Sequence, residues 1–324
     1  MKTAGSILCL AAAALMATAS APVSAQTYPD HPVRIVLPFG AGGVADITAR
    51  IVADALGAKL NQRFVVENAP GAGGIAAARS VLSSQADGYT LAMLTNGTAI
   101  SVPLFKSLPF NPVTDFMPIS SLGYFDFVIG TNPESGIKTL ADAVKMAKEK
   151  PGAINTGTIN IGSSQNLSAE LLKTSANINF TIIPYRSTPE VIIGLLRNDV
   201  QLMADSYSAM KSNIQEKKII ALATTGKTRS QSLPDVPTVE QAGVPGYEVL
   251  SWNALFAPKG TPQPVIDTLN KALQAVLTDP EVKKKMLDLG IEAKASAPAE
   301  ISARLADDIK KWGAVIERAN IPKQ

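Results

Sequence analysis

The class of fold follows from residues 33–56, which read VRIVLPFGAGGVADITARIVADAL. Residues 33–37 form a short apolar run that favours a β-strand. Beyond a glycine-rich turn, apolar residues recur at the spacing of a helix, at Val44, Ile47, Ile51, Ala55 and Leu56. A strand, a turn and a one-sided helix in this order are typical of an α/β protein.

The same alternation of apolar runs and helical periods continues to the end of the chain. Residues with capping preferences stand where helical periods begin, at Thr139, Thr188 and Asp279. The last helix has an apolar stripe that we interpret as core, so Trp312 is not counted as a site residue. We predict further strands at residues 64–67, 90–94, 125–130, 154–158, 180–183, 200–203, 219–224 and 250–257.

The amino terminus has the three zones of a secretory signal: a charged start at Lys2, an apolar run over residues 5–17 and a small-residue segment up to Ala25. We expect cleavage after Ala25, with Ala21 as the second choice. The apolar run is too short for a membrane anchor, which needs about 20 strongly apolar residues, and no later segment qualifies. The mature chain is therefore expected to be a soluble protein exported to the periplasm.

After removal of this signal the chain is long enough for two lobes, each with its own core. Pro-rich and Gly-rich connections lie around residues 103–118 and 234–246, and the strands beside them can cross between the lobes. Two crossings imply a discontinuous first lobe. We expect lobe 1 at residues 26–125 plus 250–324 and lobe 2 at residues 126–249, with mixed, mostly parallel sheets flanked by helices.

Composition argues against several classes of protein and site. The 30 basic and 27 acidic residues are scattered, which does not favour a nucleic acid as partner. Cys9 is the only cysteine and leaves with the signal, so no disulfide or reactive thiol remains. The only histidine, His31, lies near the mature terminus, which suits neither a Ser-His-Asp hydrolase nor a zinc site. We expect no catalytic residue, no cofactor and no metal ion.

Three strand-to-helix junctions can face an anion. Residues 38–43, Pro-Phe-Gly-Ala-Gly-Gly, offer backbone amides and a helix N-terminus to negative charge, although a tight turn would need the same glycines. Residues 158–165, Thr-Ile-Asn-Ile-Gly-Ser-Ser-Gln, add hydroxyl and amide side chains. The third junction places Tyr185 and Arg186 at the carboxyl end of a strand, where open α/β sheets bind ligands. Arg186 can fork onto a carboxylate or be a solvated charge, and Tyr185 can equally serve packing.

Several short motifs of the mature chain are distinctive as a set. They are Tyr28-Pro29, Val33-Arg34-Ile35-Val36, Pro38-Phe39 with Gly42-Gly43 and Asp46, Val66-Glu67-Asn68, Pro70-Gly71-Ala72-Gly73-Gly74, Asp87-Gly88-Tyr89-Thr90-Leu91, Pro184-Tyr185, Pro237-Thr238-Val239-Glu240, Gly243-Val244-Pro245-Gly246-Tyr247, Trp252 and Ala257-Pro258-Lys259-Gly260-Thr261-Pro262. In these motifs the chain resembles the substrate-binding receptors of tripartite tricarboxylate transporters, often called the Bug family, over its whole mature length.

The resemblance implies a type II periplasmic-binding-protein fold, with a carboxylate held between the loops of the two lobes. It implies a receptor, which we expect to be a monomer, that delivers a dicarboxylate, tricarboxylate or aromatic acid to the membrane components of a transporter. We give Asp46 a supporting role, because a charged carboxylate would repel an anionic ligand. The residues carried over from the family are Phe39, Ala41, Gly42, Gly43, Asp46, Gly162, Ser163, Ser164 and Tyr185, with Thr95, Asn96 and Asp205 in a second tier, and the junctions add Gly40, Gln165 and Arg186.

Departures from the family pattern fall where ligands are selected. Asn166 stands where relatives often have histidine, and Arg186-Ser187 where lysine-glycine is common. The identity of the acid stays open, and so does the output, because a receptor that signals to a sensor partner would show the same pattern. Residues 71–76 also fit the loose glycine fingerprint of a dinucleotide-dependent enzyme, but the next strand ends in Thr95-Asn96, where that fold has an acidic residue.

Overall fold

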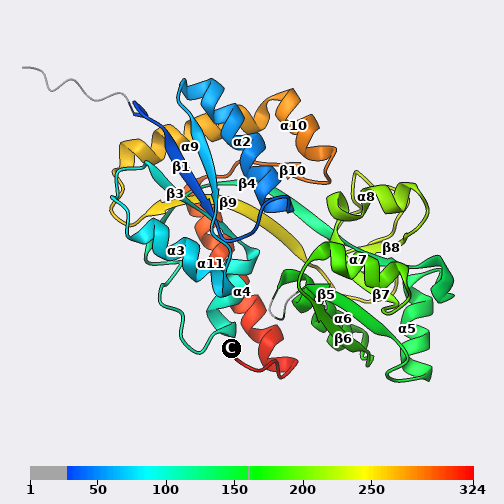
Figure 1. The fold of residues 1–324 in the computed structure, drawn as a ribbon. Helices are drawn as coiled ribbons and strands as arrows, with labels where there is room; N and C mark the ends of the chain where they lie inside the picture. Colours follow the sequence, from blue (N-terminus) through cyan, green and yellow to red (C-terminus); the bar gives the residue numbers. More distant parts are fainter. Residues whose placement is uncertain (1–27, 160, 162) are drawn as a thin grey trace, which may run out of the picture.

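The computed structural model describes residues 28–159, 161 and 163–324, so the predicted signal lies outside the described residues. Strands and helices alternate along most of this length (Figure 1). The strands are β1 (Val33–Leu37), β2 (Phe64–Asn68), β3 (Thr90–Thr95), β4 (Phe116–Thr131), β5 (Asn155–Ile159), β6 (Thr181–Tyr185), β7 (Leu202–Ser206), β8 (Ile220–Thr224), β9 (Leu250–Pro258) and β10 (Glu292–Ala293). The helices are α2 (Val44–Leu60), α3 (Ile75–Leu82), α4 (Asn96–Leu104), α5 (Leu140–Glu149), α6 (Ser164–Ala176), α7 (Thr188–Leu196), α8 (Tyr207–Gln215), α9 (Gln263–Thr278), α10 (Pro280–Leu287) and α11 (Pro298–Arg318), with short 3₁₀ helices η1 (Ala72–Gly74) and η2 (Pro133–Ser135).

The strands form two groups. In the first, β1 pairs in parallel with β2 and β3, and β9 runs antiparallel between β3 and β4. In the second, β5 pairs in parallel with β6 and β7, and β4 runs antiparallel to β7 and β8. Each antiparallel pair among the described strands involves β4 or β9. The sheet is therefore mixed because of these two strands.

β4 is the long strand that both groups share (Figure 1). Its residues 116–126 pair with β9, ending with Asp126 opposite Leu250, and its residues 127–131 pair with β7 and β8. The chain returns to the first group at Leu250, where β9 begins. Two crossings therefore join the first group, called lobe 1, to the second, called lobe 2. The predicted α/β class, with a mixed sheet flanked by helices and two strand crossings, is confirmed.

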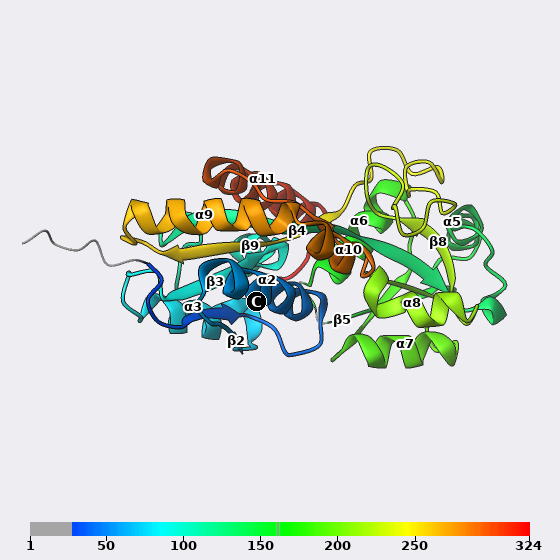
Figure 2. The same ribbon diagram turned by 90° about the horizontal axis from the view of Figure 1, so that it is seen from above.

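Each lobe is built from helices that bury one face. In lobe 1, α2 buries Ala49, Val52 and Leu56, and α11 buries the stripe predicted for it, which includes Trp312. In lobe 2, α5 and α6 contribute to one core cluster, and α7 and α8 to a second cluster across the strands (Figure 2). Because Cys9 is the only cysteine of the chain, the packing of these apolar faces has to hold each lobe together.

One predicted connection is partly wrong. The sequence predicts a connection over residues 103–118, but β4 already begins at Phe116. Pro118 has no N–H to donate to a neighbouring strand, which argues against a strand at this position. The structure accommodates it because the pairing of β4 with β9 shifts register between Pro118 and Ser120. A strand with such a bulge lacks the regular alternation that reveals strands in a sequence.

The glycine-rich turn over residues 71–76 serves close packing. Gly73 and Gly74 both have positive φ, at +64° and +70°. A Cβ on Gly73 would lie 3.1 Å from the ring of Phe105, and a Cβ on Gly74 would lie 3.3 Å from Pro38. Backbone conformation and packing therefore account for these glycines, and the turn does not favour a dinucleotide-dependent enzyme.

Thr225, which is fully buried, ties the two crossings together. Its Oγ1 accepts a hydrogen bond from Phe127 N on β4 (2.8 Å) and donates one to Val249 O at the start of the second crossing (2.8 Å). Its backbone N–H donates to Phe127 O, and its carbonyl accepts from Val249 N. A single threonine thus contacts both segments that pass between the lobes.

Asp126 lies beside this point on β4, and its carboxyl faces the backbone of Gly226. A Cβ built on Gly226 would lie 3.1 Å from Asp126 Oδ2. Burial raises the pKa of Asp126 to about 6, and a hydrogen bond from the Gly226 backbone opposes this only in part. The carboxyl is therefore mostly protonated below pH 6 and charged above it.

We expect Asp126→Asn to stabilise the protein at pH 7.5 but not at pH 4. The folded state holds the Asp126 proton more tightly than the unfolded chain, so this stabilising contribution is complete below the ordinary pKa and is lost as the pH rises through about 6. A shift of this size corresponds to a loss of about 3 kcal/mol, which asparagine avoids. Urea unfolding at pH 4, 5.5 and 7.5 measures the difference.

The exposed Asp235→Asn variant is the control for this prediction, and its unfolding free energy should stay close to wild type at all three pH values. A difference between Asp126→Asn and wild type that does not change with pH would show that the carboxyl does not titrate in this range. Within the described residues, Asp126 forms no hydrogen bond to a candidate site residue. The prediction therefore concerns the stability of the crossing and not the binding of a ligand.

Candidate functional site

Asp46, a buried carboxylate in the first turn of α2, holds the loop between β1 and α2. Its Oδ2 accepts a hydrogen bond from Gly42 N (2.9 Å), and its Oδ1 accepts one from Asn68 Nδ2 (2.9 Å). Asn68 Nδ2 also donates to Phe39 O (3.0 Å), which ties the start of the loop to the end of β2. Arg50, one helical turn further on, forms an ion pair with Asp46 at 2.9 Å.

These contacts keep Asp46 ionised. Burial acts to raise the pKa of this carboxyl, but hydrogen bonds from Arg50, Gly42 and Asn68 outweigh it, and the pKa lies below its ordinary value. The charge is thus compensated by Arg50 and by loop donors. This geometry suits the supporting role that we expect for Asp46.

The loop that Asp46 holds is open to its surroundings. Gly42 has φ of +85°, a left-handed conformation that favours glycine. A Cβ added at Gly40, Gly42 or Gly43 would meet no atom within 4 Å. Gly43 caps α2 without a side chain, so the N–H groups in the first turn of α2 are left for other partners. The residues Phe39, Gly40, Ala41, Gly42 and Gly43 are all exposed.

α4 brings a second helix N-terminus next to this loop. Thr95 caps α4, since its Oγ1 accepts from Gly97 N (3.1 Å) and its own N–H donates to Thr98 Oγ1 (3.2 Å). Gly97 lies against the loop, because a Cβ built on Gly97 would be 3.7 Å from Phe39 Cζ. Thr95 therefore holds the helix end, and Asn96 at the first helical position is left for other contacts.

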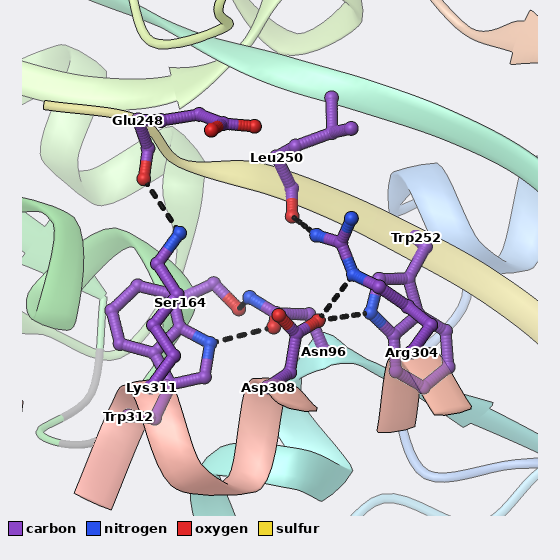
Figure 3. Close-up of polar contacts among 9 residues, drawn as sticks. All are labelled: Asn96, Ser164, Glu248, Leu250, Trp252, Arg304, Asp308, Lys311 and Trp312. Atoms are coloured by element: carbon purple, nitrogen blue, oxygen red, sulfur yellow. Dashed lines mark hydrogen bonds and ion pairs between the residues drawn. The ribbon is translucent and has the colours of Figure 1, made fainter. Parts of the chain in front are cut away.

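Asn96 forms a direct hydrogen bond between the lobes. Its Nδ2 donates to Ser164 Oγ (3.3 Å) in the first turn of α6, and its Oδ1 accepts from Trp312 Nε1 (2.7 Å) on α11 (Figure 3). Ser163 caps α6, because its Oγ accepts from Asn166 N (3.1 Å). The N-termini of α4 and α6, one from each lobe, thus meet at this hydrogen bond.

Asp205 connects three helix starts in lobe 2. Its Oδ1 accepts from Gln165 Nε2 (3.3 Å) and Ser206 N (2.7 Å), and its Oδ2 accepts from Thr188 Oγ1 (2.6 Å). These donors belong to the starts of α6, α8 and α7. Burial raises the pKa of Asp205, and the hydrogen bonds only partly oppose it. Asp205 therefore orders the helix ends, and its environment disfavours its negative charge.

Two predicted residues, Tyr185 and Arg186, make none of the contacts described above. The Tyr185 hydroxyl lies directly against Gly194 of α7, and the partly buried ring packs against the second core cluster of lobe 2. Arg186 is exposed, and its guanidinium has no hydrogen bond or ion pair within residues 28–159, 161 and 163–324. Gly162 lies outside the described residues. Like those of the other candidate residues, the roles of Tyr185 and Arg186 in binding stay predictions.

Sequence reasoning misses the side chains that position the site residues. Arg50 stands four residues after Asp46, a helical spacing that could have revealed the ion pair. Asn68 and Thr188 are polar residues at element ends, which is too common a pattern to single them out. Trp312 is assigned to the core by its apolar periodicity, which carries no information about its indole N–H.

The meeting point of these helix ends can hold a negative charge. Helix N-termini present unpaired N–H groups and a positive partial charge, and the hydroxyl and amide side chains beside them add donors. Within the described parts of the chain, no cluster of His, Cys, Asp and Glu side chains is arranged to hold a metal ion. No helix in those parts is both long and apolar enough to cross a membrane.

Comparison with known proteins gives a family match over most of the chain. The model of the family described as tripartite tricarboxylate transporter family receptor matches residues 48–321. The structure is similar to that of Rpa4515 from R. palustris, solved with adipate, with a TM-score of 0.85 and 31% identity over 91% of this chain and 99% of that one.

Two further solved structures have the same fold. The periplasmic binding protein BugD matches with a TM-score of 0.82 and 32% identity, over 92% of this chain and 100% of BugD. MatC from Rhodopseudomonas palustris, solved with bound malate, matches with a TM-score of 0.80 and 30% identity, over 89% of this chain and 100% of MatC. The two-lobed architecture of this chain is therefore that of periplasmic binding proteins.

Proposed function

This chain belongs to the receptor family of tripartite tricarboxylate transporters, and from that premise we propose that it captures a small organic carboxylate and delivers it to the membrane components of such a transporter. The proposed ligand is a dicarboxylate, since two similar receptors were solved with adipate and malate. The proposed site is the junction of the lobes, and no bond is made or broken there. We propose no cofactor.

The observation that carries this proposal is the convergence of helix N-termini from both lobes. Phe39 of the loop before α2 lies against Gly97 of α4, and Asn96 of α4 bonds to Ser164 of α6. A carboxylate is an acceptor only and needs several donors at once. Hydrogen bonds to a charged group contribute about 1.5–3 kcal/mol each, so a few of them support micromolar binding, about −8 kcal/mol.

The carboxylates near this junction do not oppose an anionic ligand strongly. Asp46 forms an ion pair with Arg50. Burial raises the pKa of Asp205, which disfavours its charged form. The exposed guanidinium of Arg186 remains a candidate for the distal end of a diacid. These electrostatics favour an anion over a cation at the junction.

We place the mature receptor in the periplasm, as for the similar BugD. The proposed signal peptide is removed after Ala25, and the proposed lobes are residues 26–125 with 250–324, and residues 126–249. Closure would bend β4 near Asp126 and the second crossing near Val249, the two segments that Thr225 contacts.

A thermal-shift screen of organic acids tests this function. We expect straight-chain diacids to raise the melting temperature, because binding to the folded state alone stabilises it by about 4 kcal/mol at a thousandfold excess over Kd. Diamides of the same acids should raise it much less, since they lack the charge that the helix ends favour. Stabilisation by nucleotides alone, or hydrolysis of an ester, would contradict the proposal.

A further inference from the structure

The orientation of the Asn96 side chain is decided by Trp312. Trp312 Nε1 lies 2.7 Å from Asn96 Oδ1, and both residues are almost completely buried, at 1% and 0% exposed. An indole N–H is a donor only, so its partner has to be an acceptor. The oxygen of the Asn96 amide must therefore face α11, and the opposite orientation would set an NH₂ group against the indole N–H.

The amide nitrogen of Asn96 consequently faces lobe 2. There it donates to Ser164 Oγ at 3.3 Å, which is longer than most hydrogen bonds from nitrogen to oxygen. Within the described chain, Ser164 Oγ is the one acceptor for this NH₂ group, which has two N–H bonds to donate. A long bond to a neutral hydroxyl is readily exchanged for a bond to a carboxylate, because hydrogen bonds to charged acceptors are shorter and stronger.

Trp312 belongs to α11, and other side chains of this helix form hydrogen bonds to the second crossing (Figure 3). Next to it, Lys311 Nζ donates to Glu248 O at 2.8 Å. About two turns further back, Arg304 Nη2 donates to Leu250 O at 3.1 Å. α11 is thus fixed along the segment that enters β9, and the indole that orients Asn96 cannot easily turn away.

We propose that Trp312 is a positioning residue for ligand selection: it locks the Asn96 amide with its NH₂ group toward the junction, so that the Asn96 side chain offers a donor and no acceptor there. The inference rests on the proposed function and adds the reason why a carboxylate end is preferred to an amide end. Without the lock, the Asn96 amide can turn over and present its oxygen to an N–H group of the ligand.

The test compares Trp312→Phe with Trp252→Phe by titration calorimetry. Both variants replace a buried tryptophan and remove one indole N–H, but the partner of Trp252 Nε1 is Asp308 and not Asn96. The probes are malate, succinate, glutarate and adipate, each against its own monoamide. The readout is the ratio of the two Kd values for each pair, because general loosening of the protein weakens both members alike.

In Trp312→Phe we expect the affinity for the diacid to fall about tenfold, as for one lost bond to a charged group, and the preference over the monoamide to fall about fivefold. In Trp252→Phe the ratio should stay within about twofold of wild type even if both affinities change. An unchanged ratio in Trp312→Phe, with diacid binding in the wild type intact, would overturn the inference and leave the proposed function standing.

Asn96→Asp is a second variant, and it tests the same preference if Trp312→Phe does not fold. Aspartate still accepts from Trp312 Nε1 but puts an acceptor where the NH₂ group was. The preference should then invert in favour of the monoamide, and a retained preference for the diacid would contradict the inference. If the wild type binds none of the four acids, the proposed function itself fails, and the inference fails with it.

Discussion

Gly42→Val is expected to abolish carboxylate binding in a protein that still folds. Gly42 has φ of +85°, and its N–H donates to Asp46. A β-branched residue in this conformation costs about 1–3 kcal/mol, which the loop can relieve by changing its backbone. The amide directions of residues 39–43 then change, and we expect Kd for a diacid to rise at least 100-fold, about 2.7 kcal/mol. Titration calorimetry measures the loss.

Gly136→Val provides a matched control. Gly136 also has positive φ, at +76°, and a Cβ there meets no atom within 4 Å. It lies after η2 in lobe 2, away from the loop that precedes α2. Its valine variant should lose similar stability and keep diacid affinity. Retained affinity in Gly42→Val, at a stability equal to that of Gly136→Val, would remove the loop from the site.

Asp308→Ala should cause a large loss of stability. Asp308 is 4% exposed, and its Oδ2 accepts from Trp252 Nε1 at 2.6 Å and from Arg304 Nε at 2.8 Å. Alanine leaves a buried indole N–H and a mostly buried guanidinium without their acceptor. Breaking a buried pair in this way costs about 3–5 kcal/mol, which urea unfolding measures.

The pair Lys284–Asp288 has the same four-residue spacing at the end of α10 but is exposed. Asp288→Ala should therefore cost less than about 1 kcal/mol. In a double mutant with Trp252→Phe, the cost of Asp308→Ala should be smaller, because one unpaired donor is gone. A loss below 1 kcal/mol for Asp308→Ala alone would mean that water replaces the carboxylate at this place.

The fold was largely predictable because its signals are local. The run at residues 33–37 and the helical period that follows it predict β1 and α2, and Thr139 predicts the start of α5 through a capping box that the structure contains. The start of β4 was not predictable. Its Pro118 and its register shift depend on pairing with β9, which lies more than a hundred residues away in sequence.

For the candidate site, the open loop before α2 was predictable from backbone composition, and the tertiary contacts that position its side chains were not. Glycines at residues 40, 42 and 43 predict a turn with accessible backbone amides, and a Cβ at any of them would indeed meet no atom within 4 Å. Nothing local indicates that Trp312, one of an apolar stripe, donates to Asn96 more than two hundred residues away. The lobe boundaries and the binding roles of all the candidate residues remain predictions.

The place of β9 in the sheet also sets an order of assembly. β9 completes the sheet between β3 and β4, yet it follows both of them only after all the strands of lobe 2. Contacts between such distant segments form slowly. A chain synthesised from its amino terminus therefore has a bare edge on β3 until residues 250–258 are available, and an unpaired strand edge of this kind is open to pairing with another strand.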